Sequence, residues 1–180
     1  MIATTHMPTQ VLSHSTARPD RRIYLLLLSA AIIVLDRLSK LWIVNHVLAG
    51  AAIPIIPGVF RITHVLNTGA AFSMFAESAS PSTVRNGLVA FSVFAVIVIA
   101  VMLYRTGRTI TLSSLAFALI LGGAIGNLFD RVRLHYVVDF LEVHIGSYHW
   151  PDFNLADSAI VIGACLLMLE IFQPSHKSAR

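Results

Sequence analysis

The sequence predicts a membrane protein that is mainly α-helical, with four transmembrane helices and a small extramembrane β-rich platform on the outer side. Hydrophobic residues make up 56% of its 180 residues and charged residues only 12%, whereas a soluble domain carries about 25% charged residues. Four apolar runs are each long enough to cross a hydrocarbon core about 30 Å thick. Between the first two runs, proline, glycine and β-branched residues favour short strands and turns.

The chain divides into one membrane-embedded domain, residues 22–173, and two polar tails, residues 1–21 and 174–180. The N-terminal tail is rich in Ser and Thr and aperiodic, so we expect it to be disordered. The first apolar run follows two arginines, as in a signal peptide, but no small-residue cleavage site comes promptly after it, which favours a retained span. The predicted spans cover residues 23–44, 84–104, 110–128 and 153–172, and the predicted outer loops cover residues 50–83 and 129–152.

Four spans place both termini on one side of the membrane, and the basic residues indicate which side. Basic residues gather in the tails and in the turn between the second and third spans: Arg18, Arg21, Arg22, Arg105, Arg108, Lys177 and Arg180. Asp20 and Glu170 are the only acids near them. Cytoplasmic segments of membrane proteins carry an excess of Lys and Arg. Both tails are therefore predicted to be cytoplasmic and both long loops to lie outside. The basic residues form no single polar stretch, which argues against nucleic-acid binding despite the net charge of +4.

Polar residues of three spans are predicted to share one layer of the membrane. Counted along the helices from the inner face, Asp36 lies about 20 Å up the first span and Asn127 about 26 Å up the third. Asp157 lies about 6 Å below the outer face in the fourth span. All three fall in the outer third of a core about 30 Å thick. Such residues are costly beside hydrocarbon and indicate a functional site.

Asp139 lies in the second predicted outer loop and Asp157 near the start of the fourth span. They are the candidate catalytic residues. Two carboxyl groups held close together share a proton over a wide pH range, so one can activate water while the other polarises a carbonyl. A structural alternative stays open at this stage. Asp139 would then pair with Arg131 or Arg133, and Asp157 would cap or pair locally.

Amides and charged partners accompany the two acids. Asn154 and Asp157 are spaced i, i+3, and Asn127 and Arg131 are spaced i, i+4, so each pair shares a helix face. The amides either orient an acid and hold a peptide backbone, or join helices through polar contacts. The residue pattern alone leaves both interpretations open.

Three further motifs have structural explanations as well as functional ones. Asp36 and Lys40 are spaced as a helical ion pair that satisfies itself, with support of a site as the second interpretation. The Asn67-Thr-Gly sequence is a turn signal, and a loop that only turns and a loop that lines a groove are equally compatible with it. Gly122 and Gly126 form a small-residue motif that predicts close helix packing.

The sequence predicts neither a metal nor a cofactor. His135, His144 and His149 raise the question of zinc, but their spacing matches no paired metal-binding motif. Cys165 is the single cysteine, so no intrachain disulfide can form.

Five ordered blocks between residues 22 and 172 resemble the bacterial lipoprotein signal peptidase, or type II signal peptidase. They are DRLSK at 36–40, NTGAAF at 67–72, GGAIGNLFDR at 122–131, VDF at 138–140 and FNLADS at 153–158. The resemblance implies a membrane-embedded aspartic endopeptidase that cuts the signal peptide of a diacylglyceryl-modified prolipoprotein just before the lipidated cysteine. Arg37 stands where this family often has Gln, and the N-terminal tail is long.

By this resemblance, Asp139 and Asp157 correspond to the catalytic pair, and no cofactor is implied. The positions that would bind substrate or support the site are Asn67, Gly69, Asn127, Arg131, Asn154, Asp36, Lys40 and Asp130. The implied setting is the bacterial inner membrane, with both termini cytoplasmic and the active site near the periplasmic face. The implied partners are prolipoprotein signal peptides and membrane lipid, and the enzyme is expected to act as a monomer.

Two rival functions remain in view. A small proton-coupled transporter component would use intramembrane acids as a proton relay. The gathering of the acids at one face, rather than in a chain through the membrane, weighs against it. A structural membrane scaffold would leave the cost of Asp139 and Asp157 unexplained.

Overall fold

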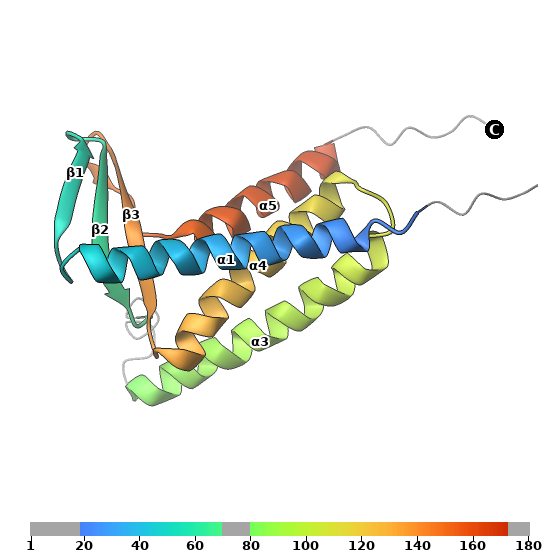
Figure 1. Cartoon of the computed structure of the whole chain (residues 1–180), viewed down its shortest axis with the longest axis horizontal. Helices are drawn as coiled ribbons and strands as arrows, with labels where there is room; N and C mark the ends of the chain where they lie inside the picture. Colours follow the sequence, from blue (N-terminus) through green and yellow to red (C-terminus); the bar gives the residue numbers. More distant parts are fainter. Residues whose placement is uncertain (1–18, 70–79, 173–180) are drawn as a thin grey trace, which may run out of the picture.

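The computed structural model describes residues 19–69 and 80–172, and both predicted tails lie largely outside these ranges. Four helices and a four-stranded antiparallel sheet make up the described chain (Figure 1). The helices are α1 (Arg22–His46), α3 (Pro81–Thr106), α4 (Leu112–Arg133) and α5 (Leu155–Phe172). The strands are β1 (Ala52–Ile56), β2 (Phe60–Asn67), β3 (Val137–Ile145) and β4 (Tyr148–His149), adjacent in that order across the sheet.

Local capping residues set the starts of α3 and α4. The Ser80 side chain accepts a hydrogen bond from the backbone N–H of Thr83. Thr111 and Ser114 form a capping box, in which each side chain accepts from the backbone N–H of the other residue. Such caps satisfy N–H groups that have no partner within the helix. They therefore fix where each helix begins and which residues reach the far end of the bundle.

Three of the four helices, α3, α4 and α5, are long and apolar enough to cross a membrane. α1 has a similar length, but Asp36, Arg37 and Lys40 interrupt its apolar sequence. Its outer surface is nevertheless apolar, because large side chains such as Leu27 and Leu38 are exposed along it. The predicted spans are thus confirmed for three helices by length and apolar character, and α1 adds a fourth helix that carries polar residues.

Two helices extend several residues beyond the spans predicted for them. α4 continues to Arg133, whereas the third span was predicted to end at residue 128. Asn127 and Asp130 lower the hydropathy there, but both side chains are buried among neighbouring helices, so the helix does not stop. Asp130 and Arg131 consequently lie on α4 rather than in a loop. α3 begins at Pro81, inside the loop that was predicted for residues 50–83.

β2 and β3 join the two predicted outer loops into one sheet. They pair antiparallel, with Val65 opposite Asp139 and Asn67 opposite Val137. Immediately before α5, Phe153 forms a further antiparallel bridge with Leu141 of β3. The predicted β-rich platform is confirmed as a small antiparallel sheet, and its strands bring Asp139 and the start of α5 together.

The sheet and the described chain ends lie at opposite ends of the helical bundle (Figure 1). At the chain-end side, Arg21 N donates to Arg108 O at 3.3 Å and Arg22 Nε donates to Tyr104 O at 2.9 Å. These bonds join the start of α1 to the end of α3 and the α3–α4 turn. An apolar cluster extends inward from there and includes Leu25, Leu103, Ala118 and Leu121.

We expect cysteines at the two ends of the bundle to react from opposite sides of the membrane. Thr109 is exposed in the α3–α4 turn and Ser147 in the β3–β4 turn. In a background in which Cys165 is replaced, a membrane-impermeant maleimide added to spheroplasts should label only one of Thr109→Cys and Ser147→Cys. Both should react after detergent solubilisation, and labelling of both from outside would contradict this arrangement.

Candidate active site

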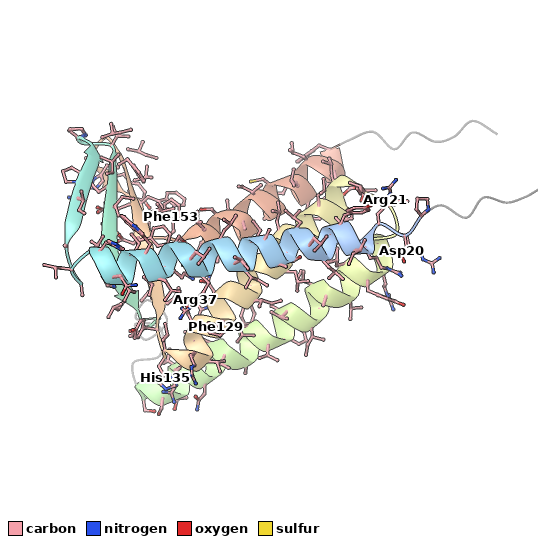
Figure 2. The ribbon with its side chains drawn as sticks, in the orientation of Figure 1. Asp20, Arg21, Arg37, Phe129, His135 and Phe153 are labelled. Atoms are coloured by element: carbon pink, nitrogen blue, oxygen red, sulfur yellow. The ribbon has the colours of Figure 1, made fainter. Side chains whose placement is uncertain are left out.

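A buried lysine lies at the centre of the polar layer. Lys40 is 0% exposed, and its ammonium forms ion pairs with Asp36 at 2.7 Å and with Asp130 at 2.8 Å. It also donates to Asn127 Oδ1 at 3.0 Å. Arg37 reaches Asp130 from the surface at 3.3 Å and lies over the ring of Phe129 (Figure 2). The predicted Asp36–Lys40 pair is therefore present, and it is part of a larger network that joins α1 to α4.

Asp36 also connects α1 to α5. Its Oδ1 accepts a hydrogen bond at 3.0 Å from the backbone N–H of Ala156, in the first turn of α5. That N–H belongs to the group that a helix cannot satisfy internally. The helices approach closely here, since a Cβ added at Gly126 would lie 2.8 Å from Asp36 Oδ2. A Cβ at Gly122 would lie 2.8 Å from the Ile32 Cβ, as the small-residue motif predicts.

Asn154 and Asp157 form a reciprocal cap at the start of α5. Asp157 N donates to Asn154 Oδ1 at 2.9 Å, and Asn154 N donates to Asp157 Oδ2 at 3.2 Å. An acid at this position also interacts favourably with the positive end of the helix dipole. The local capping that the sequence offered as an alternative for Asp157 is therefore present. It holds the carboxyl in place and leaves Oδ1 for another donor.

Amide side chains link the two candidate catalytic acids. Asn154 Nδ2 donates to Asp139 Oδ1 at 2.7 Å, so Asn154 bonds to both carboxyl groups. Asn67 Nδ2 donates to Asp139 Oδ2 at 2.9 Å, and Asn127 Nδ2 donates to Asp157 Oδ1 at 2.7 Å. Each acid therefore accepts hydrogen bonds from two different asparagines, and Asn154 is common to both.

The arginines on α4 do not neutralise Asp139. Among the described residues, Asp139 shows no ion pair with Arg131 or Arg133, so that structural alternative is not observed. Arg131 Nη1 instead donates to the Asn127 backbone carbonyl at 3.4 Å. Arg133 is exposed at the end of α4.

The turn after β2 fixes the Asn67 side chain. Gly69 N donates to Asn67 Oδ1 at 2.9 Å, which leaves Nδ2 free to face Asp139. Gly69 has a φ of +83°, and an added Cβ would lie 2.5 Å from Leu88 Cδ1 on α3. Both the backbone conformation and the close contact favour glycine at this position. The rest of the NTGAAF block, residues 70–72, lies outside the described residues.

Burial raises the pKa of the Asp139 carboxyl from its ordinary value of 3.8 to about 6. Asp139 is 2% exposed, and loss of water is the main cause of the shift. The nearby Asp157 charge raises the pKa further, whereas the hydrogen bonds from Asn67 and Asn154 lower it. Asp139 is therefore suited to carry a proton near neutral pH.

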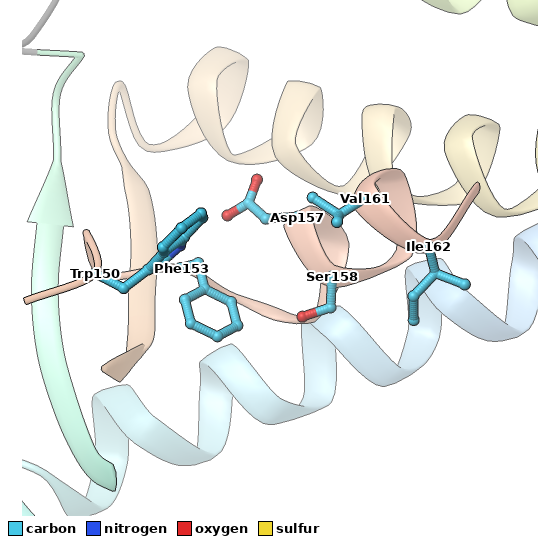
Figure 3. Close-up of a pocket in the computed structure, with 6 residues that line it drawn as sticks. All are labelled: Trp150, Phe153, Asp157, Ser158, Val161 and Ile162. Atoms are coloured by element: carbon cyan, nitrogen blue, oxygen red, sulfur yellow. The ribbon is translucent and has the colours of Figure 1, made fainter. Parts of the chain in front are cut away.

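Two cavities open beside Asp157. One has a volume of about 360 Å³ and is bounded by α5 and the segment before it (Figure 3). Its lining residues are Trp150, Phe153, Asp157, Ser158, Val161 and Ile162. The other has a volume of about 280 Å³, lies among α3, α4 and α5, and includes Asn127 and Arg131 in its lining. Asp157 therefore faces space on two sides, and most of that lining is apolar.

Several residues near the site were not singled out from the sequence. Trp150 and Phe153 line a cavity beside Asp157, and backbone hydrogen bonds of both residues to β3 bring them there. Of the histidines, His135 lies apart at the end of α4 (Figure 2). His144 and His149 meet Glu142 on the sheet, the one group among the described residues whose ligand atoms lie close enough to hold a metal ion.

The chain is similar over most of its length to known lipoprotein signal peptidases. A family model for signal peptidase (SPase) II matches residues 28–173. The lipoprotein signal peptidase of Pseudomonas putida is 46% identical over 158 residues, which cover 87% of this chain and 91% of that protein. The one from Serratia proteamaculans is 42% identical over 154 residues, covering 85% and 89%. A solved structure of a bacterial membrane enzyme superimposes with a TM-score of 0.77 at 25% identity, covering 88% of this chain and 99% of that one.

The raised pKa of Asp139 predicts a stability effect that depends on pH. A carboxyl whose pKa is about 6 in the folded protein and near 3.8 when unfolded contributes stability below pH 4 that is lost as the pH rises through 6. The shift corresponds to about 3 kcal/mol at full ionisation. We therefore expect the melting temperature of Asp139→Asn, relative to the parent, to increase between pH 4 and pH 7.

The difference in melting temperature between the two proteins is the readout, because groups that do not interact with Asp139 contribute equally to both. Glu142, which is ionised over this whole range with a pKa of about 2, contributes equally to the two proteins. A difference in melting temperature that stays constant from pH 4 to pH 7 would contradict the raised pKa.

Proposed function

The chain belongs to the signal peptidase II family, and we propose that it is an aspartic endopeptidase that removes signal peptides from diacylglyceryl-modified prolipoproteins. Cleavage would occur just before the lipidated cysteine. The observation that carries the proposal is Asn154, which hydrogen-bonds to both Asp139 and Asp157. Asn154 donates to Asp139 from its side-chain amide and to Asp157 from its backbone N–H, and two acids held by one residue form a pair that can share a proton.

The two acids have different surroundings, which suggests different tasks. Asp139 is buried, and its raised pKa suits it to hold the shared proton and donate it to the scissile carbonyl oxygen. Asp157 borders both cavities, where water and substrate can enter, so the ionised Asp157 would take a proton from the attacking water. That proton would pass to the leaving amide nitrogen as the peptide bond breaks. A hydroxyl of the tetrahedral intermediate would return its proton to Asp139 as the carbonyl re-forms, which restores the starting state of the pair.

The supporting residues would hold this pair and the substrate. Asn67, Asn127 and Asn154 donate to the two carboxyl groups, and Gly69 fixes the direction of Asn67. Arg131 lines the cavity among α3, α4 and α5 and would contact the substrate backbone. The charged network of Asp36, Lys40 and Asp130 would keep the helices in register. The apolar linings beside Asp157 suit a signal peptide and the acyl chains of the lipidated cysteine that follows it.

The proposed setting is the bacterial inner membrane, with α1, α3, α4 and α5 as four spans. The sheet would lie on the periplasmic side and both termini in the cytoplasm, because basic residues gather at the other end of the bundle. The active site would then lie near the periplasmic face, close to the cleavage position of a membrane-anchored signal peptide. The proposed enzyme acts as a monomer and needs no cofactor for cleavage.

A proton-coupled transporter component fits the structure less well. A relay needs titratable groups at intervals across the membrane. Asp36, Asp130, Asp139 and Asp157 instead share one bonded layer near the sheet. Between that layer and the chain ends lies the apolar cluster of α1, α3 and α4.

Replacing either acid should nearly abolish cleavage. Asp139→Asn or Asp157→Asn keeps the side-chain size but removes the shared proton, and combining them should add little, because the pair works as a unit. The measurement is a gel-shift or mass assay on a diacylglyceryl-modified precursor with purified protein in detergent. Near-normal cleavage by either well-folded variant would end the aspartic mechanism.

The two variants should differ in stability. Asp139→Asn should insert and extract like the parent. Asp157→Asn loses one acceptor of the cap with Asn154, at a cost of about 1 kcal/mol. Its lost activity should therefore be compared at a temperature well below its own melting point.

The Asn67 amide should matter less than the acids. Asn67→Ala removes one hydrogen bond to Asp139, worth about 1.4–2.7 kcal/mol in the transition state, so turnover should fall roughly 10–100-fold. Asn67→Asp is the matched comparison, because it keeps the acceptor toward Gly69 but faces Asp139 with an oxygen. Unchanged turnover in Asn67→Ala would mean that Asn67 serves only to form the turn after β2.

A further inference from the structure

The β3–β4 hairpin gathers three metal-ligating side chains on one face. Glu142 and His144 are two residues apart on β3, so their side chains point the same way. His149 on β4 is directly opposite His144 in the antiparallel register. Residues in that relation have neighbouring side chains. The three residues thus come together through strand pairing, although their spacing in the sequence matches no metal motif.

We propose that Glu142, His144 and His149 bind a divalent transition metal ion of the Zn²⁺ type, at a site separate from the catalytic acids. Their ligand atoms all lie within 4.8 Å of one another. His149 Nε2 is 2.6 Å, and His144 Nε2 3.2 Å, from the same oxygen, Glu142 Oε1. Ligands in a tetrahedral zinc site lie about 3.4 Å apart, given metal–ligand bonds of about 2.0–2.1 Å. Shifts of roughly 1 Å would therefore bring all three into a coordination sphere.

The buried Nε2 of His144 has one polar contact among the described residues. It lies 3.2 Å from Glu142 Oε1 but does not meet hydrogen-bond geometry with that oxygen. Buried ring nitrogens are normally satisfied, so an unpaired one calls for a partner. The His149 ring contacts Glu142 Oε1 at 2.6 Å, whereas the longer contact of His144 with the same oxygen lacks hydrogen-bond geometry. A metal ion at the centre of the three would accept lone pairs from both imidazoles.

Arg61 and Asp152 complete the surroundings of the proposed ion. Arg61 donates to both carboxylate oxygens of Glu142 from the neighbouring strand. Each carboxylate oxygen has a second lone pair, so Arg61 can orient the ligand without excluding a metal. Asp152 Oδ2 lies 4.0 Å from His149 Nε2, and its other oxygen accepts from Thr63 at 2.6 Å. Two carboxylates against one guanidinium leave a net negative charge, which favours a cation.

The proposed ion would brace the sheet rather than take part in cleavage. His144 is five positions from Asp139 on an extended strand, a separation of about 17 Å. Bound metal would join β3 to β4 and hold the segment that leads to Phe153, which pairs with β3 before α5 begins. It would thereby stabilise the strand that carries Asp139 without contacting the reacting atoms.

Zinc uptake by the full-length protein tests the proposal. Protein without a polyhistidine tag, purified in detergent and stripped with a chelator, is dialysed against micromolar Zn²⁺ and assayed for bound metal. We expect about one Zn²⁺ per chain in the parent and loss of that ion in His144→Gln and in His149→Gln. His135→Gln and His46→Gln are matched controls that should keep it, since neither residue belongs to the cluster.

Cobalt gives a second readout of the same site. Co²⁺ bound by two imidazoles and a carboxylate at low coordination number should produce visible absorption bands in the parent that disappear in His149→Gln and that Zn²⁺ displaces. Zn²⁺ should also raise the melting temperature of the parent by a few degrees and leave that of His149→Gln unchanged. Absence of stoichiometric uptake, or equal uptake by the parent and both cluster variants, would overturn the site.

Cleavage measurements keep this proposal independent of the peptidase mechanism. Chelator-treated and zinc-loaded parent should cut a lipidated precursor at similar rates well below the melting temperature. If zinc does not bind, the aspartic mechanism is unaffected. If cleavage is lost on chelation and restored by zinc, the site is not the separate brace proposed here, and the metal-independent mechanism fails as well.

Discussion

The buried charge of Lys40 is the constraint on which the rest of the polar layer depends. An ammonium removed from water costs several kcal/mol unless it is fully paired. Lys40 is paired with Asp36, Asp130 and the side-chain oxygen of Asn127. Arg37 forms a second ion pair with Asp130 from the surface. Because Asp36 also accepts from the first turn of α5, α1, α4 and α5 satisfy these groups only in one mutual register.

Lys40 also sets the orientation of the Asn127 side-chain amide. An ammonium only donates, so Asn127 must present its oxygen to Lys40 and its Nδ2 to Asp157. Asn67 is oriented in the same manner, because a backbone N–H in its own turn takes the oxygen and leaves Nδ2 for Asp139. The amide donors directed at Asp139 favour its ionised form, while burial opposes ionisation and is the larger effect.

The sequence predicted those parts of the molecule that depend on local pattern. Apolar runs indicated the helices, and turn residues indicated the β-rich segment. The cost of acids beside hydrocarbon, together with the family resemblance, pointed to Asp139 and Asp157. Features that depend on contacts between distant segments were not accessible. The extension of α4 relies on burial of Asp130 against Lys40, and the Glu142 cluster exists only because β2, β3 and β4 pair in one register.

Asp157 and Asp139 differ in how they affect the stability of the fold. Asp157 completes the cap of α5 through Asn154, so the bonds that begin the helix also place a carboxylate beside the two cavities. The stable start of α5 and the position of the Asp157 carboxylate therefore depend on the same contacts. Asp139 is different, because its burial destabilises the ionised form. That cost supports the proposal that the carboxyl is used in the reaction, so Asp139 is the stronger argument that this layer is a site as well as a contact between helices.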